Sequence, residues 1–272
     1  MKPAPFDYIR PETLVEAAGL CHQHGSEARV LAGGQSLMAM LNMRLTTPSV
    51  LIDISGLTEA SYLRADAGQV AIGCATRQAE LMRWDHVSAQ LPLLEQALPW
   101  VGHAQTRSRG TVCGSIAHAD PSSELPLCLA LLEGEVIIAH GTSTRTVTGR
   151  SFFQGLLQTA CGEDELITEI RFPHLPAGAK TSFKEMAIRH GDFAIVAVGV
   201  VAKPDQISIA IGGATDRPEV RDWPRLDGSD LDDALNELAW SLDCTSDPQA
   251  PASYRRHLIR TLGKQAVLEA TS

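Results

Sequence analysis

The chain has 272 residues, of which 44% are hydrophobic and 20% charged, so it can bury a core without disulfide bonds. Its 23 Lys and Arg against 32 Asp and Glu give a formal charge of −9, and the basic residues are scattered, which argues against a nucleic-acid partner. No apolar stretch approaches the roughly 18 to 20 residues of a membrane span, and no signal-peptide pattern follows Met1, so we expect a cytoplasmic protein.

The cysteines are widely spaced and form no C-x-x-C pair of the kind that zinc and iron–sulfur sites usually need. We expect reduced, mostly buried thiols at Cys21, Cys74, Cys113, Cys128, Cys161 and Cys244. His118 and Asp120 have the spacing of half a metal site, but a third ligand is missing, so a local hydrogen-bonded pair is favoured. We therefore predict no metal in this chain.

Helix and strand alternate in the predicted N-terminal segment. The pattern predicts a helix over 12–24, a strand over 29–31, a tight glycine loop over 32–36, a helix over 37–44 that Ser36 would cap, and a buried strand over 50–54.

The middle of the chain is predicted to be mixed α and β. A strand over 69–73 precedes helices near 76–84 and 88–98, and then periodicity is lost over 103–124. We interpret that segment as a long loop, because long loops in compact domains are usually functional. A helix over 125–132, paired strands over 135–140 and 144–148, and a strand ending at Pro173 follow.

Prolines and a glycine at 173, 176 and 178 indicate a domain boundary. Beyond it, the pattern predicts a meander of strands near 181–188, 193–202 and 206–212, and two helices over 229–242 and 253–269. A capping box formed by Ser229 and Asp232 would begin the first of these helices.

Two glycine loops are candidate phosphate sites. Ala32–Ser36 lies between a strand and a helix, where glycines let backbone N–H groups approach an anion. Such loops are also common as plain turns, and this one matches neither a dinucleotide fingerprint, a P-loop nor a hydrolase elbow. Thr111–Ser115 offers further hydroxyls and backbone donors, so the two loops could hold the two halves of a pyrophosphate.

A third segment, Arg189–Phe193, precedes an apolar run. Its glycine allows a sharp turn, and Phe193 could lie flat on a ring. The alternative is an ordinary turn with a core phenylalanine.

Together these segments resemble the FAD-binding medium subunit of the molybdenum hydroxylases, the family of carbon monoxide dehydrogenase and xanthine dehydrogenase. The resemblance covers nearly the whole chain. It is carried by Pro5-Phe-Asp-Tyr-Ile-Arg-Pro-Glu, Leu31-Ala-Gly-Gly-Gln-Ser-Leu, the segment 45–54, Arg109-Gly-Thr-Val-Cys-Gly-Ser-Ile-Ala-His-Ala-Asp-Pro-Ser-Ser-Glu-Leu-Pro and Gly191-Asp-Phe-Ala.

The resemblance implies an α+β fold and an electron-transfer function. The fold would be a PCMH-type FAD-binding domain over 1–175, with α/β subdomains at about 1–54 and 55–175, and a C-terminal antiparallel sheet with helices over 176–272. The chain would pass electrons from iron–sulfur clusters on a partner through FAD to an external acceptor, without a catalytic residue of its own.

Site residues are also implied by the resemblance. The FAD pyrophosphate would be held by Leu31, Ala32, Gly33, Gly34, Gln35, Ser36, Thr111, Val112, Cys113, Gly114 and Ser115. Asp120 and Glu124 would bind the ribityl or adenosine side, and Leu166 would lie near the flavin. Lys184 would place positive charge beside the isoalloxazine carbonyls, and Phe193 would shield a flavin face.

The family also implies partners: a small subunit with 2Fe–2S clusters and a large subunit with the molybdenum cofactor, in a dimer of heterotrimers. One departure is Cys113, where the family usually has glycine. If that position needs a positive φ, cysteine costs about 1 kcal/mol and its Cβ crowds the phosphate. The alternative is therefore a structural or assembly subunit with weakened FAD binding; a free-standing FAD oxidase is a third interpretation with less support.

Overall fold

A parallel three-stranded sheet begins the fold in this computed structural model, which describes residues 2–66 and 68–272. Its strand order is β1-β3-β2, and each connection contains a helix. The elements are β1 (Asp7–Ile9), α1 (Leu14–His24), η1 (Gly25–Glu27), β2 (Ala28–Leu31), α2 (Leu37–Asn42) and β3 (Val50–Asp53). The predicted order of elements is confirmed, although the Ser36 side chain makes no cap hydrogen bond to α2.

An antiparallel five-stranded sheet forms the second subdomain. Its order is β4-β5-β10-β6-β7, so the strand that closes the segment, β10, lies at the centre. The strands are β4 (Leu63–Asp66), β5 (Gln69–Gly73), β6 (Glu135–His140), β7 (Ser143–Thr148) and β10 (Leu166–Pro173). Smaller elements flank them: η2 (Thr58–Ala60), α9 (Gly149–Phe152), β8 (Phe153–Gly155) and β9 (Gln158–Thr159).

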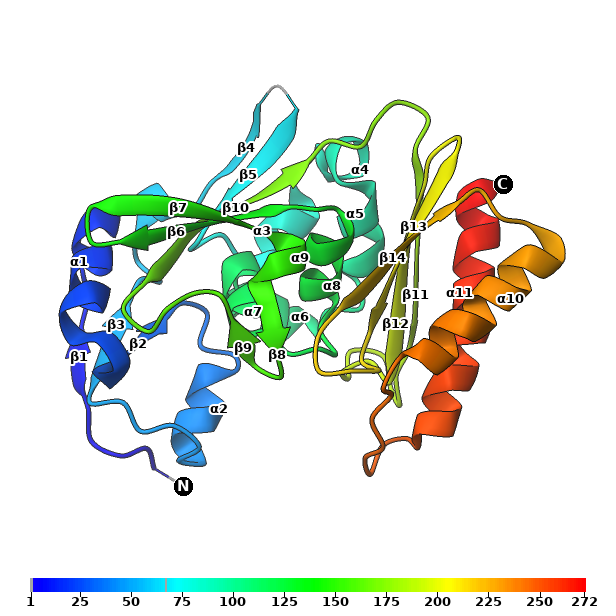
Figure 1. The fold of residues 1–272 in the computed structure, drawn as a ribbon. Coiled ribbons are helices and arrows are strands. Elements are labelled where there is room, and N and C mark those ends of the chain that lie inside the picture. The colour runs from blue at the N-terminus through cyan, green and yellow to red at the C-terminus, as the bar shows by residue number, and fades with distance from the viewer. Residues whose placement is uncertain (1, 67) are drawn as a thin grey trace.

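Six helices connect β5 to β6 and fill the middle of the molecule (Figure 1). They are α3 (Gln78–Arg83), α4 (Val87–Gln90), α5 (Pro92–Ala97), α6 (Ala104–Arg109), α7 (Val112–His118) and α8 (Glu124–Leu131). The prediction of a long loop over 103–124 is therefore wrong. Short helices of small and polar residues show little hydrophobic periodicity, and α7 is held instead by its Thr111 cap and three buried side chains.

The C-terminal sheet is an antiparallel meander in the order β11-β12-β13-β14. It comprises β11 (Lys180–Met186), β12 (Val196–Ala202), β13 (Gln206–Gly212) and β14 (Glu219–Pro224), and is followed by α10 (Gly228–Ser241) and α11 (Ala252–Thr271). The sequence missed the polar edge strand β14. The predicted capping box is also wrong, because α10 begins at Gly228 after Asp227 and has no side-chain cap hydrogen bond.

Helices cover both faces of this sheet, α10 and α11 on one side and α5 and α8 on the other (Figure 1). All of β12 is consequently buried. Helix α8 is also buried along its length and packs closely on the sheet at two glycines. A Cβ on Gly199 would lie 2.8 Å from Leu127 Cδ2, and one on Gly212 would lie 3.0 Å from Leu127 Cδ1. These glycines allow α8 to pack closely against the C-terminal sheet.

Alternation along β11 sends neighbouring side chains to opposite faces. Ser182 and Lys184 face α11, where both side chains reach the Glu269 carboxylate. Glu185 faces the other way and is only 8% exposed. Neither of its carboxylate oxygens has a hydrogen-bond partner among the described residues. Burial, and to a smaller extent the nearby Glu124 carboxylate, raise the pKa of Glu185 to about 9.

We predict that Glu185→Gln stabilises the chain at alkaline pH and not at acidic pH. A carboxyl whose pKa rises on folding, from 4.5 to about 9 here, favours the folded state at low pH and loses that contribution as pH rises. The stability of the variant relative to the native chain should rise with pH by up to about 1.4 kcal/mol per pH unit, because glutamine does not have to take up a proton when the chain folds.

Denaturant unfolding at pH 5 and pH 8 measures this difference, with Glu237→Gln on the exposed face of α10 as the control. An equal effect of Glu185→Gln at both pH values would contradict the assignment.

Candidate functional site

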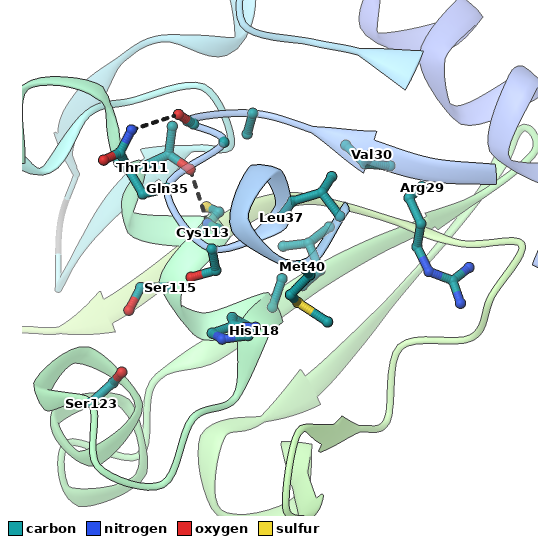
Figure 2. Close-up of a pocket in the computed structure, with 18 of the residues that line it drawn as sticks. Arg29, Val30, Gln35, Leu37, Met40, Thr111, Cys113, Ser115, His118 and Ser123 are labelled. Carbon is teal, nitrogen blue, oxygen red and sulfur yellow. Dashed lines mark hydrogen bonds between the residues drawn. The ribbon is translucent and has the colours of Figure 1, made fainter. Parts of the chain in front are cut away.

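A cavity of about 840 Å³ opens between the parallel sheet, α7 and the start of β10. This volume is within the usual range for small-molecule sites. Figure 2 shows part of it, with Gln35, Leu37 and Met40 from the loop after β2 and from α2, and with Cys113 and Ser115 on α7 and Thr111 just before that helix. Segments far apart in the sequence therefore line one space.

The loop after β2 presents a row of unused backbone donors to the cavity. Within the described residues, the amide groups of residues 33–37 donate no hydrogen bond. Gly34 has φ +70°, a conformation that favours glycine, and it turns the chain into α2. Consecutive free N–H groups before a helix form a concave anion site. The predicted phosphate loop thus has the donors that a phosphate requires.

Gly33 allows this loop to touch the segment that precedes α7. A Cβ at Gly33 would lie 2.3 Å from Arg109 O and 2.6 Å from Gly110 Cα. No real Cβ approaches backbone atoms so closely, so only glycine fits without a shift of one segment. The lack of a side chain at Gly33 is explained by this backbone contact rather than by the approach of a ligand.

Helix α7 contributes a second group of donors. The Thr111 hydroxyl accepts a hydrogen bond from Gly114 N at 3.0 Å, and Val112 N donates to Thr76 O at 3.1 Å. Cys113 N has no acceptor among the described residues. The cavity thus meets one free amide at the start of α7, opposite the loop that follows β2 (Figure 2).

Cys113 does not meet the condition under which it would disturb this site. Cys113 lies in a helix, and it is absent from the positive-φ residues of the described chain. Its side chain is 3% exposed, and its Sγ lies 3.7 Å from Ile72 O in the core. A small thiol therefore suits this position, and the argument for weakened cofactor binding loses its structural basis.

Two polar groups lie in the deep wall. Glu124 is 5% exposed, and burial raises its pKa to about 7, so the carboxyl is partly protonated at neutral pH. Gln78 donates from Nε2 to Thr111 O, while its buried Oε1 has no partner among the described residues. An unpaired acceptor in a cavity wall is unfavourable unless a ligand donates to it.

The far end of the cavity is apolar and open. Leu166 is buried at the start of β10, whereas Phe193 at the rim is 52% exposed. A phenylalanine so exposed contributes little to the core, which argues against the interpretation of this segment as a turn with a core residue. Gly191 has φ +87° and makes the turn that presents Phe193.

Most of the predicted site residues meet around this cavity. Its lining includes Ala32, Gly33, Gly34, Gln35, Ser36, Thr111, Cys113, Gly114, Ser115, Glu124, Leu166 and Phe193. Leu31 and Val112 are outside the lining, next to residues that belong to it. Asp120 is also outside, and its Oδ1 accepts a hydrogen bond from Ser122 N at 2.9 Å.

Lys184 is the clearest disagreement. Its ammonium group is paired with Glu269 on α11, on the face of the sheet opposite α8. Successive side chains of a strand face opposite sides of the sheet, so it is the neighbouring Glu185 that faces away from α11. The structure thus places Lys184 away from the cavity.

One wall of the cavity consists of residues that the sequence did not predict as site residues. Arg29 and Val30 on β2 (Figure 2), Leu157 and Thr159, and the turn before β10 line the cavity. Leu157 has φ +55° and is 46% exposed, an unusual combination for leucine. The cavity has backbone donors at one end, polar groups in its wall and an exposed aromatic ring at its rim. These features suit a ligand that carries both a phosphate and a flat ring.

Known proteins resemble this chain over nearly its whole length. A family model described as the FAD binding domain in molybdopterin dehydrogenase matches residues 4–175. The glyceraldehyde dehydrogenase medium chain of Sulfolobus acidocaldarius is 32% identical over 281 residues, covering 99% of each chain. The carbon monoxide dehydrogenase medium chain of Afipia carboxidovorans is 31% identical and covers 99% of this chain and 98% of the relative.

Solved structures show the same fold. A structure of carbon monoxide dehydrogenase from Hydrogenophaga pseudoflava contains a chain that matches with a TM-score of 0.94 at 29% identity, over 99% of this chain and 98% of that one. The match extends across the C-terminal sheet and helices as well as the cavity. The chain therefore belongs to the family of FAD-binding medium subunits of the molybdenum hydroxylases.

Proposed function

We propose that this subunit accepts electrons from iron–sulfur clusters on a partner subunit and passes them through FAD to an external acceptor. The observation that carries the proposal is the row of free amides at 33–37, which shares one cavity with the exposed ring of Phe193. FAD has an anionic pyrophosphate and a flat redox-active ring, so it matches both ends. When bound, FAD supplies the redox chemistry, and the protein sets its position and potential.

The roles of individual residues follow from their chemistry. The amides of 33–37 and of Cys113 would bind the pyrophosphate oxygens, and the Gln78 amide oxygen would accept a hydrogen bond from a ligand hydroxyl or N–H. Glu124 would meet a ribityl or ribose hydroxyl, as a donor when protonated and as an acceptor otherwise. Leu166 and Phe193 would enclose the ring and exclude water from it.

Partner subunits would hold the other redox centres. The relatives named above are medium chains, and a further relative, 32% identical, is a complex subunit of 6-hydroxypseudooxynicotine dehydrogenase. All six cysteines of this chain are free thiols, and five of them are buried. This arrangement supports placing the 2Fe–2S clusters on a small subunit and the molybdenum cofactor on a large one, in a dimer of heterotrimers.

Two further proposals concern organisation and location. A division near residue 175 would separate the FAD-binding domain from the C-terminal domain, since α10 and α11 share their own hydrophobic cluster with the sheet. The free thiols support a reducing compartment such as the cytoplasm. Within the described residues, no helix is both long and apolar enough to cross a membrane.

Gly34→Val should weaken FAD binding. Valine does not tolerate φ +70°, and a Cβ there would lie 3.1 Å from Leu31 Cδ1. A strain of about 1 to 3 kcal/mol in the phosphate loop corresponds to a dissociation constant about 5- to 150-fold higher. Gly178→Val is the matched control, because it introduces the same strain at φ +81° in a remote, open turn. Fluorescence titration with FAD measures both. Native affinity in Gly34→Val, with unchanged circular dichroism, would refute the loop assignment.

Phe193→Ala should affect the flavin ring more than FAD affinity. The variant keeps the amide donors but leaves one end of the cavity uncovered, so flavin fluorescence and reduction potential should shift while the dissociation constant changes less than in Gly34→Val. Trp240→Ala, which removes an exposed ring on α10, is the control. A native spectrum and potential in Phe193→Ala would show that the ring lies elsewhere.

Assembly is tested by co-expression with the small and large subunits of the same complex. The chain should elute with both on size-exclusion chromatography, because its flavin must lie within reach of a partner's clusters. Persistence as a 29.2 kDa monomer in their presence would contradict the proposed electron route.

A further inference from the structure

Three potential metal ligands meet outside the cavity lining. His22 comes from the end of α1, His140 from the end of β6, and Asp164 from the turn before β10. One ligand atom from each lies within 4.8 Å of the other two. Asp164 Oδ2 is 2.8 Å from His140 Nε2 and 3.5 Å from His22 Nδ1. The fold thus gathers three side chains that are distant in sequence around one point.

The charges around the cluster single out Asp164. It stands between Glu163, which pairs with Arg29, and Glu165, which pairs with Arg145. Asp164 itself has no Arg or Lys partner among the described residues, and its partners are the two imidazoles. Of the three consecutive acidic residues, Asp164 is thus the one whose carboxylate contacts two imidazole nitrogens.

The backbone holds these ligands in place. His140 ends a strand that pairs with both β7 and β10, and its carbonyl accepts a hydrogen bond from Ser143 Oγ at 2.9 Å. Gly141, at φ +57°, turns the chain beside the ring of His22. The two imidazoles meet edge to face with centroids 4.5 Å apart. The two rings therefore lie in contact beside the same carboxylate.

We propose that His22, His140 and Asp164 form a binding site for a divalent transition metal of the zinc class. In tetrahedral coordination, ligands at about 2.0 to 2.2 Å from Zn²⁺ lie roughly 3.3 to 3.6 Å apart. The separation between Asp164 and His22 already has this value, and the hydrogen bond between Asp164 and His140 opens by less than about 1 Å to admit the ion.

The donor set defines the metal. Two imidazole nitrogens and one carboxylate favour Zn²⁺, Co²⁺ or Ni²⁺ over Mg²⁺ and Ca²⁺, which prefer oxygen ligands. The three side chains are 43% to 54% exposed, so water completes the coordination. Bound metal would tie α1 to the five-stranded sheet and fix the turn whose neighbours Gly162 and Glu163 line the cavity.

The test is calorimetric titration of the untagged full-length chain with Zn²⁺, compared with Asp164→Asn and His140→Ala. Asp164→Asn nearly keeps the shape of the side chain, so it separates ligand loss from misfolding. The matched control is His24→Ala, two residues from His22 on the same helix and outside the cluster. Co²⁺ provides a second readout, through the visible absorption of a tetrahedral complex.

The native chain and His24→Ala should bind one Zn²⁺, and both cluster variants should bind at least about tenfold more weakly, the smallest loss usually seen even for groups that only orient a metal ligand. Mg²⁺ should not compete. Failure of the native chain to bind Zn²⁺, or native affinity in Asp164→Asn, would overturn the proposal. Neither result depends on FAD.

Discussion

The contact between Gly33 and the backbone of Arg109 and Gly110 determines the shape of the binding cavity. It joins a loop of the parallel sheet, which carries unused amide donors, to the turn that leads into α7, where Cys113 N is also unused among the described residues. A side chain at position 33 would force them apart by more than an ångström, since contacts of 2.3 Å must open to at least 3.4 Å for ordinary packing. The proposed phosphate site therefore depends on two loops that hold each other in position.

The remainder of the fold supports this junction. Helix α8 follows α7 and packs its leucines against Gly199 and Gly212 of the C-terminal sheet, so the wall that contains Glu124 is fixed to a rigid layer. The far face of the sheet is closed by α10 and α11. Burial on both faces has a cost, visible in the unpaired Glu185 carboxylate. Its pKa of about 9 keeps it neutral at physiological pH.

Local patterns predicted much of this structure. Glycines and apolar periodicity predict the strand, loop and helix around Gly34. Continuous apolar runs predict the buried strands β12 and β13. The helices over 104–118 were not, because their packing depends on a cap at Thr111 and on neighbours from other segments. Cys113 was misjudged because its environment is a tertiary one. Lys184 was inferred from the family resemblance alone, and in the structure it pairs with Glu269 on α11. The cluster of His22, His140 and Asp164 has no sequence signature at all, since only the fold brings the three together.

The most direct measurement is the FAD affinity of Gly33→Ala relative to Gly19→Ala. Both replace glycine with alanine, but Gly19 on α1 has nothing within 4 Å of its added Cβ, whereas Gly33 meets the Arg109 carbonyl oxygen. A packing penalty of about 1 to 3 kcal/mol at this junction predicts that Gly33→Ala binds FAD about 5- to 150-fold more weakly, while Gly19→Ala binds it like the native chain. Equal affinities of the two variants, with circular dichroism unchanged, would show that the junction does not shape the FAD site.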